Sequence, residues 1–210
     1  GGRIGDGDLG AALAWLAAML EVEGLLHEAE QSTARISELV GAVREYSYMD
    51  QAPFQEVDLH DGLENTLTIL AYKLRGIAVE REYDRGLPRV RVRGSELNQV
   101  WTNLLDNAID AINGVGGDGH GRIRVRTARE GDCALVEIAD DGPGIPPEIE
   151  GRIFEPFFTT KPQGQGTGLG LETAYRIVTE RHGGDLGVQS RPGDTRFAVR
   201  LPIEGLRTEG

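Results

Sequence analysis

Two glycine-rich clusters in the C-terminal half of the chain have the residue types best suited to bind a ligand. The first is residues 140–145, Asp-Asp-Gly-Pro-Gly-Ile, and the second is residues 166–171, Gly-Thr-Gly-Leu-Gly-Leu. Glycine lets a backbone approach a ligand closely, and a helix that begins after a glycine-rich loop presents free N–H groups to phosphate. A carboxylate beside such a loop would repel phosphate. We therefore expect Asp140 to contact another part of the ligand, for which the adenine amino group is the best candidate.

A polar stripe upstream of the two clusters completes this set of residues. Residues 98–112 are predicted to be helical because apolar side chains recur there at helical spacing, namely Trp101, Leu104, Leu105, Ala108 and Ile112. Gln99, Asn103 and Asn107 follow one another at intervals of four beside that apolar face. Asparagine disfavours helix interiors, so two on one face suggest a binding role. An amide oxygen suits Mg²⁺, which binds proteins through few side chains and the phosphates of its substrate.

Together these motifs resemble the ATP-binding catalytic domain of sensor histidine kinases, within the GHKL ATPase superfamily. The matching segments are the N box (residues 103–108), the first glycine box (140–144), the F box (154–158), the second glycine box (166–171) and a closing segment (193–197) followed by Leu201 and Pro202. Each motif alone is weak, but their order and spacing make the resemblance specific. The run Phe-Glu-Pro-Phe-Phe-Thr-Thr-Lys is similar to that of nitrogen-regulation-type sensor kinases. The resemblance covers the chain from about Pro53 onward.

The resemblance implies that the domain binds ATP with Mg²⁺. It assigns Asp140 to the adenine amino group and Asn107 to the metal. Guanine would place an acceptor oxygen against the carboxylate, so ATP should be preferred over GTP. The nucleotide-binding residues that it implies are Asn103, Asn107, Asp110, Asp140, Gly142, Gly144, Ile145, Phe157, Thr159, Thr160, Lys161, Gly166, Thr167, Gly168, Leu169, Gly170, Leu171 and Thr195.

Two of these residues are expected to act in the reaction. Asn103 stands where gyrase-like relatives carry a glutamate base, and an amide cannot take a proton, which favours phosphoryl transfer to a protein group over hydrolysis. Asp110 stands where many kinases of the family carry a lysine. Another residue must therefore supply the cation for the phosphates, and Lys161 is the best candidate.

The implied function is that of a protein-histidine kinase in a two-component system. Such an enzyme transfers the ATP γ-phosphate to a histidine, from which it passes to an aspartate in the receiver domain of a response regulator. Two alternatives are a nucleotide-sensing pseudokinase dimer and an anti-sigma-type serine kinase or other GHKL ATPase. The helix expected near residues 26–47 resembles the second dimerisation helix of sensor kinases, and it favours the sensor-kinase interpretation over the anti-sigma type.

The composition excludes several other classes of protein. The chain has 210 residues and a net charge of −12, which argues against sequence-independent binding to nucleic acid or anionic membranes. Its single cysteine, Cys133, excludes an internal disulfide framework and a cysteine-rich zinc site. No apolar run approaches the roughly 20 residues that span a bilayer. We expect a cytoplasmic location with no direct membrane insertion, and the chain begins as a fragment would.

Residues 1–52 are expected to form a partial helical dimerisation segment. Apolar and small residues recur in steps of three and four, namely Leu26, Ala29, Thr33, Ile36, Val40, Val43 and Ser47. That heptad seam predicts a homodimer through a coiled coil or helical hairpin, although it could also pack on another part of the same chain. His27 precedes a glutamate, as the acceptor histidine does in this family, but only about 30 Å of helix separates it from Pro53, with no room for a hairpin turn. We expect the phosphoacceptor upstream, so its identity is unknown.

Residues 53–210 are predicted to fold as an α+β domain, a two-layer α/β sandwich of the Bergerat (GHKL) type with a mixed sheet. Strands are expected at residues 57–59, 77–83, 90–93, 122–129, 134–139, 185–190 and 195–201. Helices are expected at 60–74, at 98–112 with Ser95 as N-cap, and at 173–182. Residues 142–168 are too irregular for a regular element, and so long a loop is usually functional.

Overall fold

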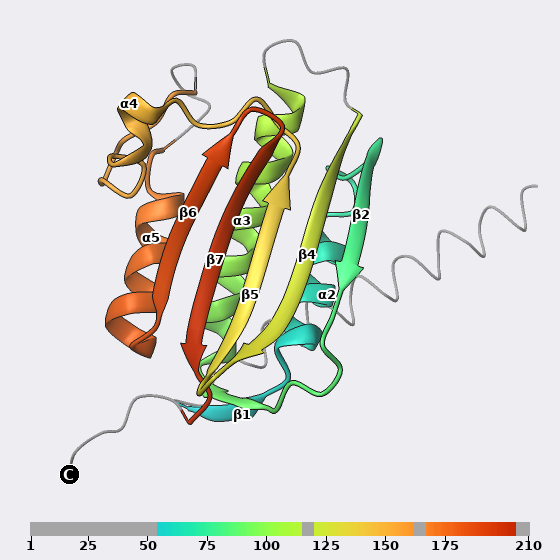
Figure 1. Cartoon of the computed structure of the whole chain (residues 1–210), viewed down its shortest axis with the longest axis vertical. Coiled ribbons are helices and arrows are strands. Elements are labelled where there is room, and N and C mark those ends of the chain that lie inside the picture. Colours follow the sequence, from blue (N-terminus) through green and yellow to red (C-terminus); the bar gives the residue numbers. More distant parts are fainter. Residues whose placement is uncertain (1–53, 115–119, 162–166, 205–210) are drawn as a thin grey trace, which may run out of the picture. The chain divides into compact units, whose positions relative to one another are not determined.

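A mixed five-stranded sheet with helices on one face forms the domain (Figure 1). The computed structural model describes residues 54–114, 120–161 and 167–204. The sheet has the order β2-β4-β5-β7-β6, and β1 pairs with β3 in a second, two-stranded sheet. The strands are β1 Gln55–Val57, β2 Ile77–Glu82, β3 Val90–Val92, β4 Gly121–Glu130, β5 Cys133–Asp140, β6 Asp185–Arg191 and β7 Asp194–Pro202. The helices are α2 Leu59–Ile69, α3 Gly94–Asn113, α4 Pro147–Glu150, α5 Gly170–Arg176 and the π-helix η2 Ile177–Arg181.

The sheet is mixed because its one parallel pair joins an antiparallel set. β2 runs parallel to β4, whereas the pairs β4–β5, β5–β7 and β7–β6 are antiparallel. Helix α3 lies in the connection from β2 to β4, as a parallel pair requires. The predicted α+β sandwich is confirmed.

The core lies between the sheet and helices α2, α3 and α5. Helix α3 buries an apolar face of Leu97, Val100, Trp101, Leu104, Leu105, Ala108, Ile109 and Ile112. Full burial of one large apolar side chain contributes roughly 1.5–3 kcal/mol. Helix α2 approaches α3 closely at Gly62, where a Cβ would lie only 2.8 Å from Asn98 Oδ1. The apolar face therefore fixes α3 against the sheet and leaves its polar side open to the glycine clusters.

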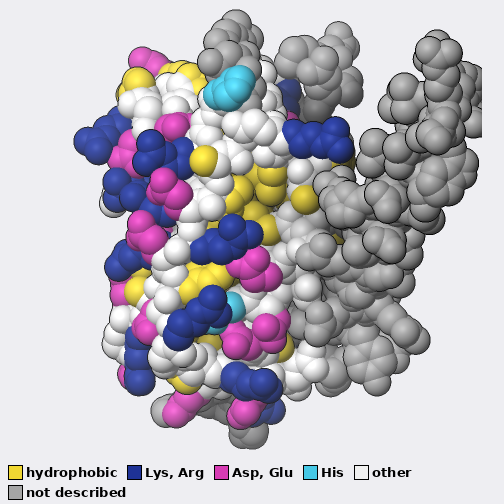
Figure 2. Space-filling model, turned by 90° about the vertical axis from the view of Figure 1, so that its right-hand side faces the viewer, with side chains coloured by type: hydrophobic (Ala, Val, Ile, Leu, Met, Phe, Trp, Pro, Cys, Tyr) yellow, Lys and Arg dark blue, Asp and Glu magenta, His cyan; other side chains and the backbone are white. Residues whose placement is uncertain are grey.

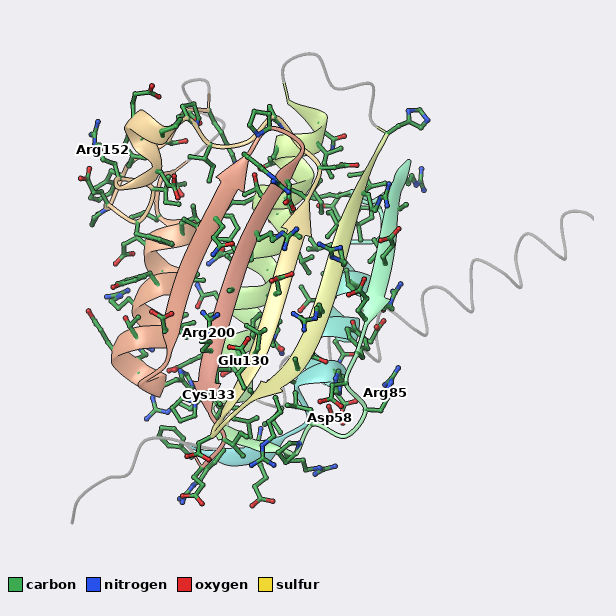
Figure 3. All side chains as sticks on the ribbon, in the orientation of Figure 1. Asp58, Arg85, Glu130, Cys133, Arg152 and Arg200 are labelled. Carbon is green, nitrogen blue, oxygen red and sulfur yellow. The ribbon has the colours of Figure 1, made fainter. Side chains whose placement is uncertain are left out.

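Charged side chains cover the surfaces that the helices leave open. Figure 2 views the molecule from the side of β2, where basic and acidic side chains lie next to one another. Ion pairs on this edge strand join Arg81 to Glu64 at 2.7 Å and Glu80 to Arg122 at 3.3 Å. On the open face of the sheet, Arg200 pairs with Glu130 at 2.9 Å (Figure 3). Charges on an edge strand discourage pairing with another sheet.

Several element boundaries differ from the predictions. The first strand ends at Val57, and Asp58 instead caps helix α2 by accepting a hydrogen bond from the His60 N–H at 2.9 Å. Helix α2 ends at Ile69, before the predicted end at residue 74. Ser95 is not an N-cap, because α3 begins at Gly94. The long loop contains the short helix α4.

The predicted dimerisation segment, with its seam at residues 26–47 and His27, lies outside the described residues. Its boundary at residue 52 stays a prediction. Among the residues that the structure describes, no helix is long and apolar enough to cross a membrane.

A buried histidine ties the start of α3 to the end of η2. His182 is 2% exposed; its Nδ1–H donates to the Ile177 carbonyl at 2.9 Å, and its Nε2 accepts from the Arg93 N–H at 3.1 Å. A carbonyl can only accept and an N–H can only donate, so the imidazole must be neutral. Burial lowers the pKa of His182. Protonation would turn Nε2 into a donor facing another donor.

We predict that His182 makes the domain less stable in mild acid. Its pKa is about 6.5 in the unfolded chain and lower in the folded one, so the unfolded state binds more protons once the pH falls below 6.5. This contribution to the free energy of unfolding is complete above pH 6.5 and declines toward the folded pKa, by at most about 1.4 kcal/mol per pH unit. In urea unfolding, the free energy of unfolding should fall less between pH 7.5 and pH 5.5 in His182→Gln than in the unmutated protein. Exposed His120→Gln is the control, and equal losses in all three proteins would contradict the prediction.

Candidate nucleotide-binding site

A buried carboxylate lies where strand β5 ends and the first glycine cluster begins. Asp140 is the last residue of β5 and is directly opposite Thr195 of β7. Asp140 is 5% exposed and Thr195 is 4% exposed, both on the face of the sheet that the helices cover. The Gly142 N–H donates to Asp140 Oδ1 at 3.0 Å, and within the described part of the chain this carboxylate has no other hydrogen-bond donor.

Burial raises the pKa of Asp140 to about 6. The Gly142 N–H opposes this effect, while the nearby Asp141 and Asp194 carboxylates add to it. A buried carboxylate without enough donors is costly, and a ligand amino group would supply the missing hydrogen bond. The site therefore favours a neutral donor such as the adenine amino group over any second anion.

The loop after Asp140 is fixed by close backbone contacts with the β6–β7 hairpin. Gly144 has a φ of +84°, and a Cβ there would lie 2.7 Å from the Arg191 carbonyl carbon. The Gly193 N–H donates to the Gly142 carbonyl at 2.8 Å. The Ile145 N–H donates to Ser190 Oγ at 2.8 Å, and Ser190 in turn bonds Thr195 at the same distance. These contacts hold the first glycine cluster beside the carboxylate.

Helix α3 connects the two glycine clusters. A Cβ on Gly142 would lie 3.1 Å from the Ala111 Cβ, and a Cβ on Gly170 would lie 3.5 Å from Asn103 Oδ1. Ala111 and Asn103 are eight residues apart, or about 12 Å along a helix axis. Asn103 Nδ2 is buried and has no hydrogen-bond partner among the described residues, so it is a donor ready for a ligand oxygen.

The predicted metal residue lies beside the predicted phosphate-binding lysine. Lys161 Nζ donates to Asn107 Oδ1 at 3.5 Å and forms an ion pair with Asp110 Oδ2. Within the described residues, no group of three His, Cys, Asp or Glu side chains could hold a metal by itself. A single amide oxygen fits a metal ion that arrives bound to phosphates.

The F box touches the second glycine cluster through its backbone. Gly168 has a φ of +67°, and a Cβ there would lie 2.3 Å from the Phe157 carbonyl carbon, so only glycine fits. Phe157 itself has a φ of +65°, which strains a residue other than glycine, and its side chain is 75% exposed. Phe154 packs on Tyr175 with ring centroids 5.0 Å apart.

The remaining predicted residues lie at the rim of this region or outside the described residues. The Lys161 N–H donates to Thr159 Oγ1 at 3.2 Å, and the Leu169 N–H donates to Thr167 Oγ1 at 3.4 Å. Thr160 is exposed, and Leu171 is half-buried. Gly166 is not among the described residues. Ser190 and Ala111 were not predicted as site residues, although the hairpin register places Ser190 opposite Thr195.

Comparisons with known proteins decide the family. Residues 93–205 match the family described as histidine kinase-, DNA gyrase B-, and HSP90-like ATPase. The catalytic domain of histidine kinase ThkA is 30% identical, and the match covers 99% of it and 73% of this chain with a TM-score of 0.65. The chain belongs to this ATPase family and carries a histidine kinase catalytic domain. The family match implies ATP binding.

Other relatives agree with this assignment. The sensory histidine kinase/phosphatase NtrB of Rhodobacter capsulatus is 34% identical over 190 residues, which are 81% of this chain and 50% of NtrB. The signal transduction histidine-protein kinase AtoS of Escherichia coli is 34% identical over 80% of this chain and 27% of AtoS. This catalytic domain and its flanking residues therefore span about half the length of NtrB. The individual roles of the site residues stay predictions.

We predict that Asp140 makes the nucleotide-free domain less stable as the pH rises. Its pKa is about 6 in the folded protein and 3.8 in the unfolded chain, so the folded state holds more protons between these values. Stability from this group is complete below pH 3.8 and is lost as the pH rises through 6. At pH 7.5, Asp140→Asn should be more stable than the unmutated domain by on the order of 2 kcal/mol, and the gain at pH 4.5 should be about a third of that. Thermal unfolding at both pH values tests this, with exposed Asp132→Asn as control. An Asp140→Asn variant that is less stable than the unmutated domain at pH 7.5 would contradict it.

Proposed function

We propose that this domain binds Mg²⁺-ATP and transfers the γ-phosphate to a histidine, from which it passes to an aspartate of a response regulator. The observation that carries the proposal is the arrangement along α3. The buried Asp140 carboxylate lies beside Gly142, which packs on Ala111 of this helix. Asn103 and Asn107 lie on the same helix, and Lys161 Nζ contacts Asn107. A site that combines a carboxylate short of donors with amide and ammonium donors suits a nucleotide, because a nucleotide carries an amino group as well as phosphates.

The comparisons support the same reaction. Curated relatives over this length are named sensory or signal transduction histidine kinases. A structure of histidine kinase ThkA in complex with the response regulator protein TrrA is 27% identical to this chain with a TM-score of 0.60. We propose that this chain also acts with a response regulator, as a cytoplasmic homodimer formed through the seam at residues 26–47.

Each side chain of the site would have a separate role in phosphoryl transfer. The Asp140 carboxylate would accept a hydrogen bond from the adenine amino group, and the Asn107 amide oxygen would be the protein ligand of the metal. Mg²⁺ supplies neutralisation of the phosphate charge when it is bound. Lys161 would donate to a phosphate oxygen, and the buried Asn103 amide would donate to another.

Catalysis at such a site depends on position and charge. Asn103 cannot remove a proton, so the site does not activate water through this residue. The phosphoryl group would instead be held in line with an incoming imidazole. Orientation and electrostatic stabilisation are the main contributions of protein groups to phosphoryl transfer.

We predict that the chain transfers label from γ-labelled ATP to a histidine-containing dimerisation helix supplied in trans, and that Asn107→Ala does not. The variant lacks the metal ligand, so its ATP affinity should also stop responding to Mg²⁺ in calorimetry. Label that is acid-labile and alkali-stable would support phosphohistidine. Acid-stable label would indicate the serine-kinase alternative, and ATP binding without any label would indicate a nucleotide sensor.

A further inference from the structure

The two lysines of the chain pair with aspartates on one helix, α3. Lys73 and Lys161 are the only lysines in the sequence. Lys73 Nζ pairs with Asp106 Oδ1 at 2.9 Å, and Lys161 Nζ pairs with Asp110 Oδ2. Asp106 and Asp110 are four residues apart on α3, so they lie on the same side of the helix. The first pair ties α3 to the segment after α2, whereas the second ties it to the loop that follows the F box.

The Lys161 ammonium lies in a position that a metal would need. It donates to Asn107 Oδ1 at 3.5 Å, and this is the oxygen proposed to bind Mg²⁺. An ammonium and a divalent cation that share this oxygen repel one another. Binding of the metal at Asn107 therefore favours movement of Lys161 away from it.

The Asp110 carboxylate would oppose ATP if it were left uncovered. Its side chain is 46% exposed and lies about one helical turn from Asn107. A carboxylate this close to phosphate oxygens is repelled by them, and the Lys161 ammonium screens it in the nucleotide-free domain. A triphosphate carries more negative charge than one carboxylate, so it attracts the ammonium more strongly.

We infer that Asp110 is a positioning residue that holds Lys161 beside Asn107 in the nucleotide-free domain and gives it up to the phosphates when Mg²⁺-ATP binds. This inference rests on the proposed function. The exchange needs little energy, because a solvent-exposed ion pair is worth about 0.2–1 kcal/mol. Asp110 thus pre-positions the cation and also competes with the nucleotide for it.

The first experiment uses no nucleotide. Acetylation of the two lysines by a water-soluble N-hydroxysuccinimide ester is followed by mass spectrometry in the full chain. Asp110→Asn should accelerate modification of Lys161 at least about threefold and that of Lys73 much less, because the ion pair with Asp110 holds the Lys161 ammonium away from the reagent. Asp106→Asn should do the reverse. The pKa of Lys73 is raised mainly by its hydrogen bond to Asp106, which makes it a suitable internal control. Equal Lys161 rates with and without the Asp110 carboxylate would overturn the inference.

The second experiment measures ATP affinity by calorimetry without metal. Asp110→Asn should tighten binding by about two- to fivefold, which is the equivalent of one exposed ion pair. In a Lys161→Gln background this gain should shrink by at least about half, since no lysine remains to be released. Adenosine affinity should not change in any variant, and Asp106→Asn is the charge-matched control.

The outcomes separate the inference from the proposed function. If Asp110→Asn tightens ATP binding equally in the Lys161 and Lys161→Gln backgrounds, Asp110 acts by simple repulsion of the phosphates. That result would overturn the exchange even if the labelling result agreed. An unmutated domain that binds no ATP while its labelling rates follow the prediction would refute the proposed function, and the exchange with it.

Discussion

The Asp140 carboxylate is buried with too few hydrogen-bond donors around it, and the geometry of the site follows from that constraint. The residue ends β5 in the middle of the sheet, where β4 and β7 flank it and the helices cover it. One backbone N–H, from Gly142, partly satisfies it. The remaining desolvation of this carboxylate destabilises the folded protein until a ligand supplies a donor. The site thereby lowers the stability of the domain and favours ligand binding.

Helix α3 serves both the core and the site. Trp101 and Leu104 on its apolar face are almost completely buried. This packing fixes the rotation of the helix against the sheet. That rotation leaves Asn103 and Asn107 half-buried on the side of the glycine clusters. The polar stripe could not be turned elsewhere without exposing the apolar face, so the packing of α3 fixes the position of the side chains proposed to bind the phosphates and the metal.

Much of the fold was predictable from the sequence because its signals are local. The sequence predicted strands close to the bounds of β4, β5, β6 and β7, and the spacing of Trp101, Leu104 and Leu105 indicated α3. The start of α3 was not predictable, because the Arg93 N–H donates to His182, 89 residues away. The assignment of Asp58 to a strand was wrong because an aspartate before a helix can serve as a cap.

The site shows the same division between local and distant information. Asp140, Gly142 and Gly144 lie close together in the sequence, so the sequence alone indicated that they form one motif. The contact between Lys161 and Asp110 joins residues 51 apart across an irregular loop, and no periodic pattern indicates it. Side-chain pairs of this kind depend on the path of the loop in space.

The most direct test of the central claim compares ATP with inosine triphosphate, in which an oxygen replaces the adenine amino group. If the Asp140 carboxylate accepts a hydrogen bond from that group, calorimetry should show at least about tenfold weaker binding of inosine triphosphate, since losing a bond to a charged group costs about 1.5–3 kcal/mol. Asp140→Asn should narrow the difference, because an amide can also donate to the oxygen. Equal affinity of the unmutated domain for the two nucleotides would contradict the assignment of Asp140 to the adenine.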